Sequence, residues 1–210
     1  NIITCYDILP KVSLRVNIDR TNLDAGAEIA QILKDKGIGD KVTPYLGKVT
    51  NENGSSDHLC LSAQEFAKND FEFISSDVTK SNWSSRYPIP RNNFCGADCL
   101  NSFVVGPTGA LYKCWNDIGH PNRVVGSLTD SSIKAYRDIM YQYLLFDPTQ
   151  DSKCRPCKFL PICMGGCPYF RQKQSPDNCY VYRSILEHNI KFAAQQLLNE
   201  RQKNSDEELI

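Results

Sequence analysis

Eight cysteines gather between positions 95 and 179 of this 210-residue chain, with spacings typical of metal ligands. Four of them lie within 14 residues, in the pattern C-x2-C-x5-C-x3-C. Close CxxC pairs in a protein without signs of secretion are more often metal ligands or redox pairs than disulfides, so the spacing favours a metal site. The eight predicted ligands are Cys95, Cys99, Cys114, Cys154, Cys157, Cys163, Cys167 and Cys179.

The end of the dense cysteine run suggests how the thiols are shared between sites. Cys167 is followed directly by Pro168. In bacterial two-cluster ferredoxins, the last cysteine of a related C-x2-C-x2-C-x3-C-P run ligates the other cluster. The same division predicts two [4Fe-4S] clusters, each held by four thiolates. The first cysteine set is Cys95, Cys99, Cys114 and Cys167, and the second cysteine set is Cys154, Cys157, Cys163 and Cys179.

Zinc is the competing metal, because four thiolates in a tetrahedral array also suit structural Zn²⁺. Zinc sites more often contain two CxxC pairs, whereas this chain has one, Cys154 and Cys157. Iron-sulfur clusters are therefore the preferred prediction, and zinc stays open as the alternative.

The region before the cysteines has an α/β pattern. Residues 12–19 alternate between apolar and polar side chains, which predicts a strand with Arg15 and Asn17 on its polar face. A helix capped by Asn22 and a second strand at residues 42–46 follow. Strand, helix and strand at this spacing predict parallel strands with a right-handed crossover. A polar strand face opposite a helix-covered face suits a barrel or half-barrel that holds a ligand.

Further elements are predicted on either side of a boundary near Pro88 and Pro90. Ser62 can cap a second helix, and residues 106–109 can turn a hairpin that places Cys114 opposite Asn101. A helix follows at about residues 133–144. The final helix is predicted from about Cys179, with a polar, frayed end beyond Glu200 and an apolar stripe of Tyr182, Leu186, Ile190, Ala193 and Leu197.

The cysteine pattern, together with Gly109-x4-Cys114, resembles the SPASM domain, the auxiliary-cluster extension of radical S-adenosylmethionine (SAM) enzymes. The likeness covers residues 93–180, and the stretch VSLRVNIDRTN at residues 12–22 looks like the fourth strand of the radical SAM barrel. It implies an α/β chain that is the C-terminal portion of such an enzyme. The implied parts are the second part of a partial (β/α) barrel at 1–86, a small α+β, cysteine-rich SPASM domain with a β-hairpin at 87–182, and a C-terminal helix and tail at 183–210.

The resemblance also implies a chemistry. The full enzyme would cleave SAM at a third [4Fe-4S] cluster held by CxxxCxxC, and the resulting radical would abstract hydrogen from a peptide or protein substrate. This sequence contains no CxxxCxxC motif, so we expect it to be inactive alone. By the same resemblance, Arg15 and Asn17 would contact SAM. Trp115 stands where the sulfatase-activating branch has aspartate, so a thioether or other crosslink is expected rather than formylglycine.

Composition limits the other classes of function. Lysines and arginines (24) balance aspartates and glutamates (24), which gives no indication of nucleic acid or an anionic membrane as partner. No apolar run reaches the roughly 18 residues of a membrane span, and no secretory signal opens the chain, so a cytoplasmic location is expected. Two other functions stay open, a ferredoxin-like electron-transfer module and a zinc-stabilised binding module. An exposed barrel edge could also pair with a second copy.

Overall fold

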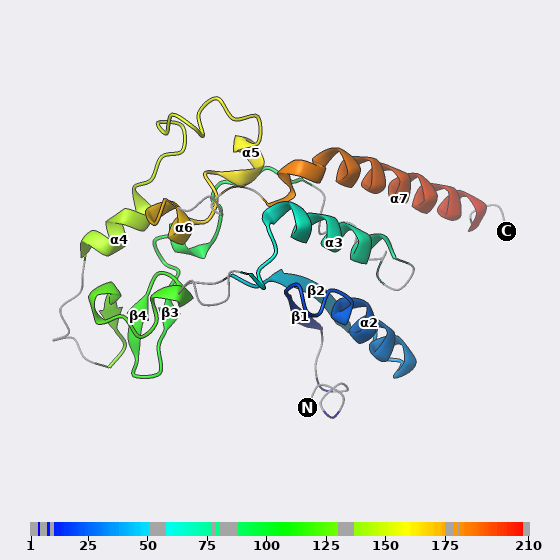
Figure 1. Ribbon diagram of the computed structural model, residues 1–210, viewed down its shortest axis with the longest axis horizontal. Coiled ribbons are helices and arrows are strands. Elements are labelled where there is room, and N and C mark those ends of the chain that lie inside the picture. Colours follow the sequence, from blue (N-terminus) through cyan, green and yellow to red (C-terminus); the bar gives the residue numbers. More distant parts are fainter. Residues whose placement is uncertain are drawn as a thin grey trace. The chain divides into compact units, whose positions relative to one another are not determined.

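The computed structural model divides the chain into two compact units (Figure 1). Unit 1 comprises residues 1–88 and 184–210, and unit 2 comprises residues 89–183. The segment 183–210, predicted as a separate part, is thus grouped almost entirely with unit 1. The structure describes residues 4, 8, 11–50, 58–76, 79, 88–129, 137–174, 179 and 181–207.

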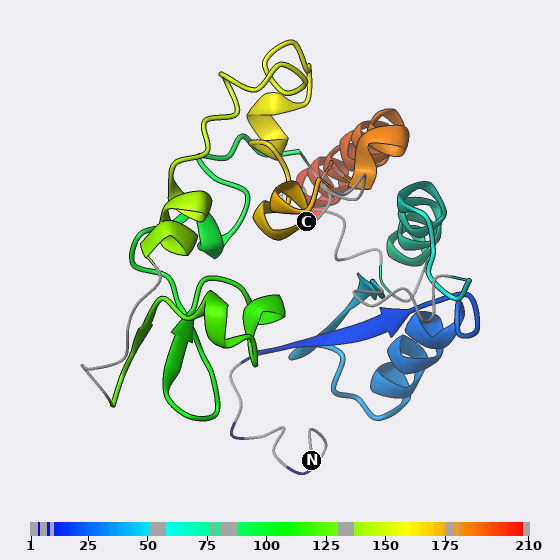
Figure 2. The same ribbon diagram turned by 60° about the vertical axis from the view of Figure 1, so that its left-hand side comes forward.

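Unit 1 begins with a βαβ segment, as the periodicity predicts. Strand β1 (Val12–Ile18) and strand β2 (Val42–Lys48) are parallel, and helix α2 (Ala25–Asp35) connects them (Figure 2). The strands pair in register from Val12 opposite Val42 to Ile18 opposite Lys48. The apolar positions of the segment meet in one core, because the helix and the strands turn them to the same side. This core is formed by Leu33, Ile38 and Val42, with Val12, Leu14 and Ile29 packed against it.

The predicted cap of α2 is wrong. The helix begins at Ala25 after Asp24, which makes no side-chain cap. Asn22 instead closes the turn after β1, where its Oδ1 accepts from the Asp19 backbone N–H at 2.8 Å and its Nδ2 donates to the Asn17 carbonyl at 3.0 Å. Asparagine binds nearby backbone groups readily in turns, and here that local bonding wins over helix capping.

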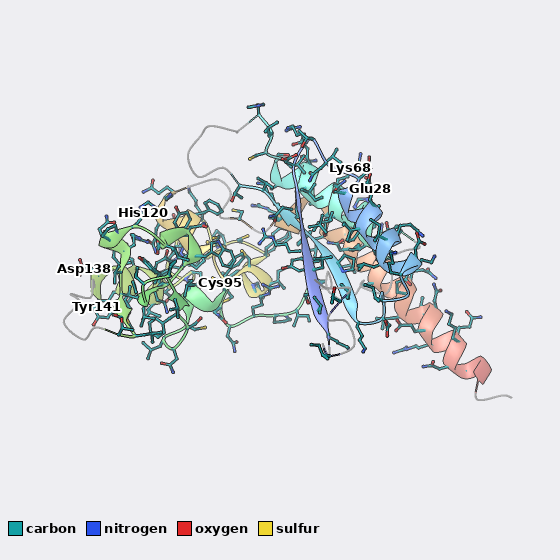
Figure 3. All side chains as sticks on the ribbon, turned by 90° about the horizontal axis from the view of Figure 1, so that it is seen from below. Glu28, Lys68, Cys95, His120, Asp138 and Tyr141 are labelled. Carbon is teal, nitrogen blue, oxygen red and sulfur yellow. The ribbon has the colours of Figure 1, made fainter. Side chains whose placement is uncertain are left out.

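Helix α3 (Ala63–Ser75) begins at the predicted cap. Ser62 and Glu65 form a reciprocal capping box, so each side chain accepts from the other residue's backbone N–H. Arg20 donates two hydrogen bonds to the Glu65 carboxylate, at 2.7 and 2.8 Å. The loop after β1 is thereby tied to the start of α3. Glu28 on α2 and Lys68 on α3 are exposed (Figure 3).

The last helix differs from its prediction in bounds and in packing face. A 3₁₀ helix, η7 (Val181–Ile185), comes first, and α7 (Leu186–Glu207) follows and continues past residue 200. Phe71 of α3 packs edge-to-face against Phe192 of α7, with ring centroids 5.7 Å apart. In the predicted stripe Ala193 is buried, but Ile190 and Leu197 are 43% and 42% exposed. Asn189 is buried instead.

Unit 2 is built from short elements. A three-stranded antiparallel sheet has the order β3-β4-β5. The described elements of unit 2, in chain order, are η3 (Gly96–Asp98), β3 (Val104–Val105), β4 (Ala110–Tyr112), η4 (Trp115–Asp117), η5 (Pro121–Arg123), β5 (Gly126–Ser127), α4 (Arg137–Leu144), α5 (Leu160–Cys163) and α6 (Pro168–Gln172). The predicted positions 133–136 of the helix before Asp147 lie outside the described residues.

The predicted hairpin is present, but its register differs by one residue. Val104 pairs with Tyr112 and Val105 with Leu111, a register that places Cys114 opposite Ser102 rather than Asn101. The Gly106 N–H donates to the Ala110 carbonyl at 2.8 Å, which leaves three residues in the loop. Gly109 ends that loop with φ +81°, the left-handed residue that a three-residue hairpin loop requires.

The described strands are fewer than a partial barrel needs. In unit 1 they form a two-stranded sheet, so the barrel implied by the resemblance stays a prediction. Among the described helices, none has both the length and the apolarity to cross a membrane.

Candidate metal centre

The second cysteine set lines a single cavity of unit 2. Cys154, Cys157, Cys163 and Cys179 all contribute to its wall, and its volume is about 700 Å³. That size lies within the usual range for ligand and cofactor pockets. None of the nine described cysteines forms a disulfide, so all eight predicted ligands carry free thiols.

Local hydrogen bonds position the start of this set. The Asp151 carboxylate accepts from the backbone N–H groups of Lys153 and Cys154, both at 2.8 Å. The Cys157 N–H then donates to the Cys154 carbonyl at 2.9 Å, which closes a tight turn between the two cysteines. The x2 spacing therefore places both thiols on one side of the cavity wall.

A left-handed turn separates Cys163 of the second set from Cys167 of the first. Met164, Gly165 and Gly166 have φ values of 49°, 86° and 74°. Glycine adopts such angles without a steric penalty. At Gly165 a side chain would also collide with Phe146, because a Cβ there would lie 2.4 Å from its ring. The x3 spacing thus contains the residues that let the chain leave one set and enter the other.

The first cysteine set is held by loop and strand ends. Cys95 precedes η3 and accepts at its sulfur from the Ala97 N–H at 3.4 Å, and Figure 3 labels this residue. Asn93 Nδ2 donates to the Cys99 sulfur at 3.1 Å and to the Cys95 carbonyl at 2.8 Å. Cys114 follows β4, and the neighbouring thiols that influence it are Cys95 and Cys167.

A buried lysine lies beside the first set. Lys113 is 2% exposed, and its ammonium group donates to the carbonyls of Cys99 and Ser102 and lies 4.9 Å from the centroid of the Phe103 ring. Burial lowers the pKa of Lys113, while nearby Cys99, Asp98 and Cys95 act in the opposite direction. A cation at this position would stabilise thiolates or an anionic cluster.

One ion pair connects the two sets. Arg171 of α6 donates to Asp98, between Cys95 and Cys99, at 3.1 Å, and both side chains are largely buried. Its guanidinium group lies 3.7 Å from the centroid of the Phe146 ring and donates to the Gly166 carbonyl at 3.3 Å. Arg171 also lines the cavity of the second set. A single side chain thus contacts the loop of one set and the cavity of the other.

Three of the thiols have a raised pKa and are therefore not activated as nucleophiles. Burial raises the pKa of Cys114 to about 11, with Asp117, Cys167 and Cys95 adding to the effect. Burial likewise raises the pKa of Cys154 to about 11, with Asp151, Cys163 and Cys179 contributing, and raises that of Cys95. Reactive catalytic cysteines have a lowered pKa, so these groups suit metal ligation, in which the metal displaces the proton, better than nucleophilic attack.

In neither cysteine set do the described side chains surround a single point closely enough to bind one metal ion. Among the described residues, no three Cys, His, Asp or Glu side chains come close enough to hold one metal ion. A single Zn²⁺ needs four sulfurs at about 2.3 Å from one centre. A four-iron cluster is ligated by four cysteines that each bind a different iron, so its ligands surround a larger body.

Arg15 and Asn17 belong to unit 1, where they lie on the exposed face of the sheet. Arg15 Nε donates to Asn17 Oδ1 at 2.9 Å, and the guanidinium group lies against Gly47 of β2. The strand alternation correctly placed both residues on the polar face. Their role in SAM binding stays a prediction.

Comparison with known proteins finds no matching family model, curated protein or solved structure. The case for a metal centre therefore comes from the cysteines and their neighbours. Sequence reasoning missed Asn93, Lys113 and Arg171, which contact the cysteine loops. The position of Lys113 directly before a predicted ligand was the one sequence signal for these residues.

Proposed function

We propose that this chain binds two [4Fe-4S] clusters, one in each cysteine set. The observation that carries the proposal is the cavity of about 700 Å³ whose wall contains all four thiols of the second set. These thiols come from positions up to 25 residues apart (154 to 179), so their meeting at one cavity does not follow from local spacing alone. The first set supports the second cluster, because Cys114 has Cys95 and Cys167 as neighbours.

The charges around the second set favour an anionic cofactor. Of the described residues that line its cavity, Lys153, Arg171 and Arg183 are basic and Asp151 is acidic. A cubane cluster with four thiolate ligands is negatively charged, and neighbouring cations offset the loss of its hydration. When bound, the clusters would accept and donate single electrons. The chain's own residues would hold the thiolates, supply the cations and shield the site with Phe146 and Phe159.

We further propose that the two clusters are the auxiliary clusters of a radical SAM enzyme that modifies a peptide or protein. The support is the resemblance of the cysteine pattern to the SPASM domain. SAM and a third cluster would belong to a CxxxCxxC motif that this sequence lacks. A thioether or other crosslink is the favoured product, because Trp115, rather than aspartate, follows Cys114 and is 67% exposed.

The first experiment is metal analysis of anaerobically purified protein. We expect about eight irons and eight sulfides per chain. The variant Cys157→Ser should lose about half of the iron, and Cys99→Ser should lose iron from the other site. Cys60→Ser is the matched control, because Cys60 belongs to neither set, and it should keep the full content. Zinc without sulfide would overturn the cluster proposal.

The radical SAM proposal has its own test. A longer version of the chain that includes an upstream CxxxCxxC motif should form 5′-deoxyadenosine from SAM under reducing, anaerobic conditions. The chain alone should not. If the longer version binds its clusters but forms no 5′-deoxyadenosine above background, the radical SAM proposal is wrong while the cluster proposal stands.

A further inference from the structure

The ion pair between Asp98 and Arg171 joins two parts of unit 2 that carry different cysteine sets. Asp98 lies in η3, between Cys95 and Cys99 of the first set, whereas Arg171 lies in α6 and lines the cavity of the second set. The two side chains are only 15% and 10% exposed, so water and salt screen their charges less than charges on the surface. Both charges can therefore act on groups beyond their own contact.

Contacts on several sides fix the guanidinium group of Arg171. Its Cζ lies 3.7 Å from the centroid of the Phe146 ring, and Phe146 itself lines the cavity of the second set. One terminal nitrogen donates to the Gly166 carbonyl at 3.3 Å, and the other donates to Asp98 at 3.1 Å. Asp98 is also held from its other side, because its Oδ2 accepts from the Phe94 backbone N–H at 3.2 Å. Each of the two charges thus has a fixed position.

The two charges differ in the cysteines that they face. Burial raises the pKa of Cys95, and the Asp98 carboxylate adds to the effect, so the negative charge acts on the first set. Among the described residues that line the cavity of the second set, Arg171 is present and Asp98 is not. Reduction makes a cluster more negative by one electron, so a nearby cation stabilises the reduced form and a nearby carboxylate destabilises it.

We propose that the ion pair between Asp98 and Arg171 sets the reduction potentials of both clusters, so that the two potentials depend on the same pair of side chains. The inference rests on the two clusters of the proposed function. Each reduction takes up one electron from an external one-electron donor, and no covalent bond forms or breaks. Arg171 is a positioning residue in this scheme and is not a ligand.

The test is a dithionite titration of the anaerobic, full chain, in which electron paramagnetic resonance detects the reduced clusters. Spectra of Cys157→Ser and Cys99→Ser, which each lack one cluster, assign the two signals. Arg171→Met removes the positive charge and should lower both midpoint potentials. Arg171→Lys keeps the charge and should leave both close to the parent values. Arg201→Met makes the same charge change on the exposed surface of α7 and should shift neither potential.

A variant of the carboxylate should act in the opposite direction. Asp98→Asn removes the negative charge, so the potential of the first cluster should rise, while that of the second cluster should change less. The double variant Asp98→Asn/Arg171→Met removes both charges, and its first cluster should return toward the parent potential. A general disturbance of the fold would not give shifts of opposite sign. The signs therefore separate an electrostatic role from a purely structural one.

Two results would overturn the proposal. One is a protein with two clusters whose potentials are unchanged in Arg171→Met. The other is a shift in the same direction in Arg171→Met and Asp98→Asn, which would indicate altered structure rather than altered charge. A parent protein without iron and sulfide would instead refute the proposed function, and this inference with it. Iron and sulfide analysis before the titration distinguishes these failures.

Discussion

Different kinds of interaction stabilise the interior of each of the two units. Unit 1 is a βαβ segment and two further helices around apolar side chains, with Val42, Leu33 and Phe73 among the buried residues. Unit 2 has short strands and helices, and many of its buried contacts are polar, such as Asp117 with Arg123 and Lys113 with two carbonyls.

The difference shows where metal binding would be needed for stability. Apolar burial stabilises unit 1 whether or not a metal is present. Short elements around free thiols gain less from burial, and small cysteine-rich domains often draw folding free energy from their metal. We therefore expect unit 2, and not unit 1, to depend on its cofactors.

Metal removal should produce the largest effect. Chelation and anaerobic gel filtration should abolish slow amide hydrogen exchange across residues 154–167, because binding free energy is folding free energy in such sites. The amides of β1 and β2 should keep their protection. Equal loss in both units, or no loss in either, would contradict the comparison.

Breaking the ion pair between Asp117 and Arg123 in unit 2 should have the second largest effect. Asp117→Asn leaves Arg123 without its charge partner, and we expect a loss of about 3 kcal/mol in the free energy of unfolding of unit 2. Urea unfolding followed by hydrogen exchange measures it. Asp138→Asn, at an exposed position of α4, is the matched control and should change stability little. If both variants are equally stable, the pair is not a structural element.

Removing the buried lysine should have an intermediate effect. Lys113→Met takes the donor from the carbonyls of Cys99 and Ser102, which should destabilise unit 2 by about 1–3 kcal/mol. The exposed Lys203→Met serves as control. Iron content of the anaerobic protein is the second readout, and retention of a fully loaded, equally stable first set would refute the assigned role.

A change at the helix cap should affect unit 1 alone. Ser62→Ala removes the acceptor for the Glu65 N–H and should destabilise α3 by about 1 kcal/mol. Exchange of the α3 amides should accelerate while that of the α6 amides stays unchanged. Faster exchange in α6 as well would show that the two units are energetically coupled.

The smallest effect is a pH dependence in unit 1. Hydrogen bonds from Arg20 and from Ser62 lower the pKa of Glu65 from 4.5 to about 2. A carboxylate with a lowered pKa stabilises the fold above its unfolded pKa, so this contribution should be lost as pH falls from about 4.5 toward 2. Glu65→Gln keeps the capping geometry but not the charge. The difference in melting temperature between the two proteins should therefore shrink across that range, and a constant difference would exclude the charge effect.

The sequence predicts the parts of the fold that follow from local pattern. Alternation predicted β1, Ser62 predicted the start of α3, and Pro107 with Gly109 predicted the hairpin. The hairpin register was wrong by one residue because a left-handed Gly109 lengthens the loop, and this cannot be seen in the pattern of apolar residues. The burial of Asn189 in place of Ile190 likewise depends on how α7 packs against α3.

The candidate site also has one part that the local sequence predicts and another part that depends on the tertiary fold. The cysteines are recognisable from spacing, but the contact between Asp98 and Arg171 joins positions 73 residues apart. Such a pair has no local signature, because its geometry is set by the tertiary fold.

The short connection from Cys163 to Cys167, which contains the left-handed turn at residues 164–166, limits how far apart these two cysteines can lie. Cys163 and Cys167 are four residues apart, so their Cα atoms can be separated by at most about 14 Å even if the chain between them were fully extended. If each cysteine ligates a different cluster, the short connection keeps the two clusters close enough for direct electron transfer between them. The module would then exchange electrons as one connected pair of centres rather than as two isolated ones.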